Sequence, residues 1–139
     1  MRICKQVEDK MIWIFLIALW VTFILTRINA SLFHDFQTYN KHAPKKSQAK
    51  TLSGFLRRKT GFDWHHIHLG FIILIILLPF ILINGLTNLL TIFLAVGLSF
   101  VFDQVLPWLD LGNYFSKKML LISVIFHILI SIIAIFMLS

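Results

Sequence analysis

Residues 69–102 read LGFIILIILLPFILINGLTNLLTIFLAVGLSFVF, an apolar stretch interrupted mainly by the segment NGLTN at 84–88. A helix that crosses the hydrocarbon layer of a membrane needs about 20 residues, so this stretch is too long for one crossing and suits two. Asparagine and glycine are typical of turns, which places the connection at NGLTN. The stretch therefore predicts a tight helical hairpin with spans at about 66–84 and 87–105.

Two further apolar runs flank the hairpin, at about 11–30 and 118–138. The first contains Arg27, whose long side chain can extend to the membrane interface from a position near a helix end. Together the runs predict an all-α, polytopic membrane protein with four transmembrane helices in a single membrane domain, residues 1–139.

The first run has a second interpretation, as a signal sequence that is cleaved. Arg2, Lys5 and Lys10 precede the run and Ala30 follows it, which loosely resembles a processing site. Cleavage sites prefer small neutral residues, however, and Asn29 is not one of them. We therefore expect the run to be retained as a span.

The composition agrees with a membrane protein. Hydrophobic residues make up 58% of the chain and the mean hydropathy is +0.85, whereas soluble domains are about 45–50% apolar. Because Cys4 is the only cysteine, no internal disulfide can form. The net charge of +7 suits anionic lipid head groups and gives no reason to expect a nucleic-acid partner.

The positions of the basic residues predict the orientation. In a four-span layout, one side of the membrane receives the residues Arg27, Lys41, Lys45, Lys46, Lys50, Arg57, Arg58, Lys59, Lys117 and Lys118. The positive-inside rule then predicts a basic cytoplasmic loop at about 31–64, termini that face outward, and the inner membrane of a bacterium as the location. Within this loop, we expect Arg57, Arg58 and Lys59 to contact lipid head groups.

A candidate site combines histidines and a carboxylate. His65, His66 and His68 begin the second span and Asp103 ends the third, so a hairpin places them at one face of the membrane, the predicted cytoplasmic face. Imidazole and carboxylate ligands suit a divalent metal such as zinc. His65 and His68 share a helix face, whereas recruiting His66 needs an irregular first turn. The alternative is a polar structural cluster that binds no metal.

Two aspartates in this region have simpler interpretations. Asp63 is well placed to cap the second helix through its carboxylate. Asp103 shares a helix face with Ala95 and Ser99, and small residues at this spacing favour close helix packing, which directs Asp103 into protein. Alternatively, Asp103 ends its helix in the head-group region.

The last span carries a polar seam of Ser123, His127 and Ser131, spaced four residues apart on one helix face. Such residues usually form hydrogen bonds to a neighbouring helix, and a proton relay is the alternative. His127 lies about 13 Å inside the span, which separates it in depth from Asp103 and the histidine cluster. Direct ligation of one ion, or of a haem, by all of them is therefore disfavoured.

The runs FDWHHIHLG at 62–70 and GLSFVFDQ at 97–104 resemble small uncharacterised bacterial integral membrane proteins. Members of that group have a His-His-x-His-x-Gly helix start, followed at hairpin distance by an Asp-Glu helix end; here Gln104 replaces the glutamate. The resemblance implies a shared membrane topology, and since the group has no assigned reaction, it implies no activity.

These features lead to three functional hypotheses. The first is a small integral membrane protein with a polar His/Asp site at the cytoplasmic face, which binds a metal, a membrane-protein partner or a second copy of the chain. The second is a metal-dependent membrane enzyme acting on a lipid or another amphiphile, with metal-bound water as nucleophile. The third is a transporter or channel component in which Asp103 and His127 pass protons or cations.

Overall fold

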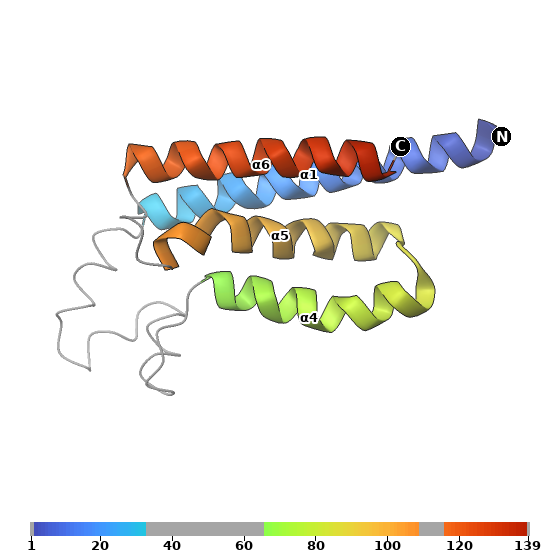
Figure 1. Cartoon of the computed structure of the whole chain (residues 1–139), viewed down its shortest axis with the longest axis horizontal. Helices are drawn as coiled ribbons and strands as arrows, with labels where there is room; N and C mark the ends of the chain where they lie inside the picture. The colour runs from blue at the N-terminus through green and yellow to red at the C-terminus, as the bar shows by residue number, and fades with distance from the viewer. Residues whose placement is uncertain (1, 33–65, 109–115, 139) are drawn as a thin grey trace.

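The structure is a computed structural model that describes residues 2–32, 66–108 and 116–138. The described chain forms the helices α1 (Arg2–Leu32), α4 (His66–Asn84), α5 (Asn88–Trp108) and α6 (Lys117–Leu138), and these residues contain no strand (Figure 1). Each helix includes a segment long and apolar enough to cross a membrane. The predicted fold class, an all-α polytopic membrane protein with four transmembrane helices, is confirmed.

The helix bounds lie close to the expected spans except at the N-terminus. α1 begins at Arg2, well before the apolar run expected at about 11–30. The additional residues include lysine, glutamine and glutamate, which are good helix formers, so the backbone hydrogen bonds continue past the apolar run. Within α1, the segment suited to cross a membrane is Asp9–Ser31.

Consecutive helices run antiparallel, so α1 and α5 end where α4 and α6 begin (Figure 1). We call this side of the bundle the Arg27 end. At the opposite end, residues 85–87 connect α4 to α5, and Gly85 has a φ of 68°, a left-handed conformation that favours glycine. The Thr87 hydroxyl then accepts a hydrogen bond from the Leu90 amide at 3.4 Å and caps the start of α5.

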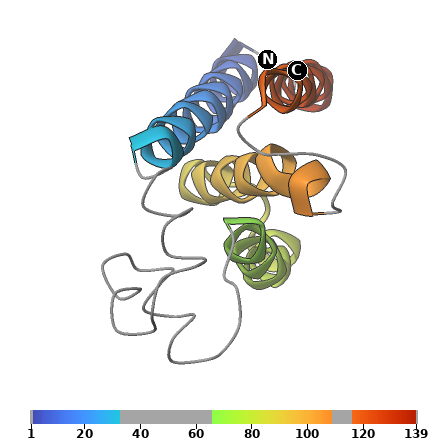
Figure 2. The same ribbon diagram turned by 90° about the vertical axis from the view of Figure 1, so that its left-hand side faces the viewer.

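Helix α5 is the central element of the bundle. It packs against α4 on one face and against α1 and α6 on the other (Figure 2). The contact with α4 is very close: a Cβ added at Gly70 would lie 2.8 Å from the carbonyl oxygen of Gly97 and 2.9 Å from Cγ2 of Val101. Glycines let helix backbones approach in this way, so Gly70 and Gly97 set the distance between the two helices.

Apolar side chains lie both inside the bundle and on its exterior. A central apolar cluster is formed by the buried residues Phe15, Leu19, Ala95 and Ala134. Large apolar side chains also point outward, for example Ile83 at 80% exposure and Phe136 at 79%. A soluble protein rarely exposes this much apolar surface, which is the surface that lipid covers in a membrane.

Candidate functional site

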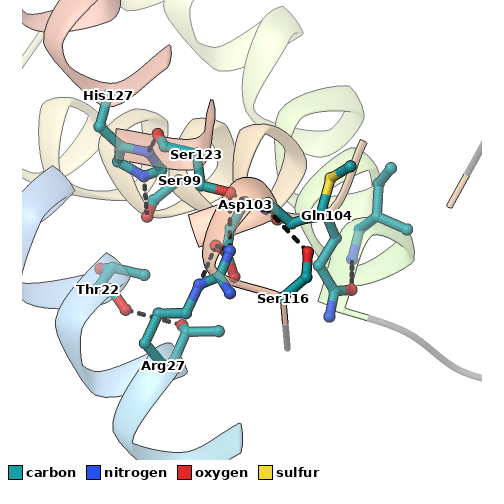
Figure 3. Close-up of polar contacts among 11 residues, drawn as sticks. Thr22, Arg27, Ser99, Asp103, Gln104, Ser116, Ser123 and His127 are labelled. Atoms are coloured by element: carbon teal, nitrogen blue, oxygen red, sulfur yellow. Dashed lines mark hydrogen bonds and ion pairs between the residues drawn. The ribbon is translucent and has the colours of Figure 1, made fainter. Parts of the chain in front are cut away.

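An ion pair and a serine hydroxyl join three helices near the Arg27 end of the bundle (Figure 3). Arg27 on α1 donates from Nε to Oδ1 of Asp103 on α5 at 2.7 Å, and its Nη2 lies 2.6 Å from the same oxygen. Nη2 also donates to the Ser123 hydroxyl on α6 at 2.8 Å. The Asp103 side chain is 1% exposed and that of Arg27 15%. A charge pair is therefore held inside a bundle of membrane-spanning helices.

Neighbours on the same helices hold this pair in place. The Arg27 guanidinium lies 5.7 Å from the centre of the Phe23 ring, one turn earlier in α1, which keeps it beside the bundle through a cation–π contact. Ser123 accepts a hydrogen bond from Arg27 and donates one to the backbone carbonyl of Asp103 at 3.2 Å. This single hydroxyl thus connects both charged residues to α6.

His127 lies one turn after Ser123 and is fully buried. Its Nδ1 is 2.7 Å from the Ser123 carbonyl oxygen, and its Nε2 is 3.0 Å from the Ser99 hydroxyl. Because a carbonyl only accepts, Nδ1 carries the hydrogen; in the neutral ring, Nε2 therefore accepts from Ser99. The ring packs against Phe23 and Trp20, with centroid distances of 4.3 Å and 5.7 Å.

The hydrogen bonds continue from His127 towards the middle of the bundle. Ser131 donates to the His127 carbonyl at 2.7 Å, and the Trp20 indole donates to the Ser131 hydroxyl at 3.1 Å. We call the connected set the polar network: Trp20, Arg27, Ser99, Asp103, Ser123, His127 and Ser131. From Ser123 to Ser131 it extends about 12 Å along α6, which is less than half of a hydrocarbon layer of about 30 Å.

The polar network begins near a span end and finishes against the apolar cluster. Arg27 is four residues from the end of the Asp9–Ser31 span and Asp103 two from the end of Asn88–Val105. At 1.5 Å per residue, the ion pair lies about 3–6 Å inside the Arg27 end of the bundle. Further in, Ala95 lies about one turn before Ser99 in α5 and Ala134 about one turn after Ser131 in α6, so polar groups give way to the apolar cluster.

The start of α4 and the end of α5 meet, as the hairpin prediction expects. The Gln104 side-chain oxygen accepts a hydrogen bond from the Ile67 amide at 3.3 Å, and the His66 ring lies 5.9 Å from the Phe100 ring. His66 and His68 are half-buried in the first turn of α4. A hydrogen bond and a ring contact therefore fix the start of α4 to the end of α5.

The metal-site prediction is not tested by these residues. His65 lies outside the described residues, as do Asp63, Arg57, Arg58 and Lys59. Within 2–32, 66–108 and 116–138, no group of three or more His, Cys, Asp or Glu side chains could hold a metal ion. Asp103, the expected carboxylate ligand, instead forms the ion pair with Arg27.

The structure adds two relationships that the sequence analysis missed. Arg27 was expected to extend to the membrane interface, but its guanidinium turns towards Asp103. The depth of His127 was expected to separate it from Asp103, and no hydrogen bond joins the two side chains in the part of the chain that the structure describes, but Ser123 bonds the backbone carbonyl of Asp103 through its hydroxyl and Nδ1 of His127 through its own carbonyl. A signal for the first was present, because an aspartate within an apolar span needs a cation and Arg27 interrupts another span.

Comparisons with known protein families, with curated proteins and with solved structures gave no match. The polar network is therefore the feature of the chain that bears on its function.

The hydrogen bond between Trp20 and Ser131 offers a measure of how firmly α1 and α6 are joined. Replacing Trp20 with Phe and Ser131 with Ala, singly and together, is expected to give a coupling free energy of about 0.5–1.5 kcal/mol. Reversible unfolding in mixed detergent micelles measures this quantity. Thr26→Val is the control, because the Thr26 hydroxyl donates to the Thr22 carbonyl of its own helix. Additive effects of the two changes would contradict the bond.

Proposed function

We propose that this chain is a small multi-pass membrane protein that handles protons, as a component of a transporter or channel does. The observation that carries the proposal is the Arg27–Asp103 ion pair, buried within membrane-spanning helices. Ser123 links it to His127, because its hydroxyl accepts from Arg27 and donates to the Asp103 backbone carbonyl, while its own backbone carbonyl accepts from Nδ1 of His127. Ionisable groups are costly inside a membrane and are typical of proton relays and ion pathways. The distribution of basic residues supports a cytoplasmic position for the Arg27 end, and the inner membrane of a bacterium is the location that we propose.

The polar network has the chemistry that proton transfer requires. The Asp103 carboxylate can accept a proton, and so can Nε2 of His127 in its neutral form. The Ser99 hydroxyl donates to Nε2 of neutral His127 and can accept from it once the ring is protonated, whereas the direction of the Ser123 hydroxyl is fixed by Arg27, from which it accepts, and by the Asp103 carbonyl, to which it donates. In the described conformation, the apolar cluster of Phe15, Leu19, Ala95 and Ala134 closes the route, as a hydrophobic gate does by excluding water.

A metal-dependent enzyme acting on a lipid has less support, because Asp103 would first have to leave Arg27 before it could bind a metal. The main alternative function is binding of a membrane-protein partner or of a second copy of the chain. In that case the polar network only holds α1, α5 and α6 together, and its titratable groups do not transfer protons.

Proton flux into liposomes separates these possibilities. Purified protein is reconstituted with a pH-sensitive dye inside, and a potassium gradient with valinomycin drives protons inward. We expect the wild type to dissipate the potential through proton entry, and Asp103→Asn and His127→Gln to reduce the rate at least about tenfold, since each removes a proton acceptor. Asp9→Asn, which removes an exposed carboxylate near the other end of α1, is expected to retain the wild-type rate.

The proposal fails if Asp103→Asn and His127→Gln reconstitute as folded protein and keep the full proton flux. It also fails if wild-type liposomes are no more permeable to protons than empty ones. Helix content by circular dichroism shows that the variants are folded.

A further inference from the structure

Helix α5 carries a line of residues, spaced four apart, that continues beyond the polar network to the hairpin end of the bundle, where residues 85–87 connect α4 to α5 (Figure 1). The line consists of Asp103, Ser99, Ala95, Thr91 and Thr87. The first four are at most 1% exposed, whereas Thr87 is exposed at the hairpin end. Each step advances about 6 Å along the helix and about 40° around it, so the line winds slowly along α5.

Thr91 is a buried polar residue outside the polar network. Its hydroxyl donates to the Thr87 carbonyl at 2.8 Å, and the side chain is 0% exposed. This bond uses the one hydroxyl hydrogen, and the two lone pairs of the oxygen can still accept from a water molecule or another hydroxyl. Thr91 therefore places a hydrogen-bonding oxygen inside the bundle, on the side of the apolar cluster that faces the hairpin end.

Ala95 interrupts this line of polar side chains. It lies one turn from Ser99 and one turn from Thr91, within the apolar cluster that also contains Phe15 and Leu19. Ser99 and Thr91 are therefore about 12 Å apart along the helix axis, much farther than a hydrogen bond of about 3 Å. One water molecule can bridge two groups about 6 Å apart. A hydroxyl at position 95 would thus divide the interval into two gaps of the length that single water molecules bridge.

Resting on the proton-handling function proposed above, we propose that Thr91 carries the proton route onward to the hairpin end and that Ala95 is the position at which the route is closed. A proton that leaves Ser99 crosses the apolar cluster through transient water, reaches the Thr91 hydroxyl and leaves at the exposed Thr87. Each hydroxyl on the way accepts a proton on one side and releases one on the other, so no oxidant, reductant or other co-reactant is required.

The alternative is that Thr91 only completes hydrogen bonding within its own helix. Thr26 on α1 offers a direct comparison, because it is also buried and its hydroxyl also donates to a carbonyl one turn earlier, that of Thr22 at 2.8 Å. Thr26 does not belong to the line on α5. A role in proton transfer therefore predicts different effects of removing the two hydroxyls, whereas a structural role predicts similar effects.

Thr91→Val tests this difference in the liposome assay, because valine keeps the branched shape and removes the hydroxyl. We expect proton entry to fall at least about tenfold, as loss of a group that transfers a proton requires. Thr26→Val is the matched control and is expected to retain the wild-type rate. A folded Thr91→Val protein with the wild-type rate, or equal losses in the two variants, overturns the proposal.

Ala95→Ser tests the proposal in the opposite direction, because it adds a hydroxyl at the closed position. We expect proton entry to rise at least about tenfold above the wild type, since a polar group in a hydrophobic constriction favours the water that transfer needs. Ala95→Cys adds a larger atom with only weak hydrogen bonding and is expected to conduct no faster than the wild type. The double variant with Ala95→Ser and Thr91→Val is expected to lose the increase.

Two results of this test would contradict the inference. An equal increase in Ala95→Cys would show that loosened packing lets protons through, and an increase that persists without the Thr91 hydroxyl would show that protons take another route. Ala134→Ser keeps the test decisive if Ala95→Ser does not fold, because Ala134 belongs to the same apolar cluster from α6. It is also expected to raise proton entry, and wild-type flux in every folded variant of this kind overturns the proposal.

The same assay separates this inference from the proposed function. If Asp103→Asn reduces the flux and Thr91→Val does not, the inference fails and the proton-handling function stands. If wild-type liposomes are no more permeable to protons than empty ones, the proton-handling function fails. Absence of flux in Ala95→Ser would then overturn the inference as well.

Discussion

Replacing Arg27 with glutamine is expected to lower the free energy of unfolding by about 3–5 kcal/mol. The reason is that Asp103, 1% exposed, would retain a buried charge without the cation that balances it. The Ser123 hydroxyl would also lose the hydrogen bond that the Arg27 guanidinium donates to it. Reversible unfolding in mixed detergent micelles, followed by circular dichroism, measures the loss.

A double substitution separates the charge effect from the loss of packing. Arg27→Met with Asp103→Leu removes both charges and keeps similar volumes, so it is expected to be more stable than either single change. Lys10→Gln is the matched control, because Lys10 is exposed on the same helix, and its effect is expected to stay within about 0.5 kcal/mol. Equal effects of Arg27→Gln and Lys10→Gln would show that the ion pair does not stabilise the fold.

Gly70→Ala is expected to destabilise the contact between α4 and α5 by about 1–3 kcal/mol, an overpacking effect. The added Cβ would meet the Gly97 carbonyl oxygen at 2.8 Å, and a backbone atom in a helix cannot move aside without moving the helix. At Gly97, the nearest atom is Cδ2 of Leu74 at 2.9 Å, the far end of a flexible side chain. Gly97→Ala is therefore expected to have the smaller effect in the same unfolding measurement.

Gly85→Ala provides a control of a different kind. Among the residues that the structure describes, no atom lies within 4 Å of an added Cβ there, so the expected cost is that of the left-handed backbone at φ 68°. We expect a loss of about 1 kcal/mol without any change in how α4 packs. If Gly70→Ala lowers the free energy of unfolding no more than Gly85→Ala does, the close approach of α4 and α5 does not contribute to the stability of the bundle.

The helices could be predicted because membrane insertion depends on length and hydropathy, both of which are plain in the sequence. The segment NGLTN at 84–88 marks the turn at Gly85 for the same reason, since polar turn residues interrupt two long apolar runs. Helix α1 extends further than expected because its polar first residues still favour a helix.

The site was harder to predict because a membrane helix is largely apolar both on the side that faces the bundle and on the side that faces lipid. In a soluble bundle, the contrast between polar and apolar residues shows which face of a helix is inside, and here that contrast is nearly absent. The stripes containing Asp103 and His127 were visible from four-residue spacing. Their connection through Ser99 and Ser123, and the pairing with Arg27, depend on the rotation and contact of three helices, which spacing along one helix does not give.

The separation of the ion pair along the chain has a consequence for biosynthesis. Arg27 precedes Asp103 by 76 residues, so at roughly 5–20 residues per second a ribosome makes the arginine about 4–15 s before its partner. During that interval the guanidinium needs water or lipid phosphate at the edge of the membrane, where a long side chain can place it. The contact between α1 and α5 can therefore form only after α5 has been synthesised and inserted into the membrane.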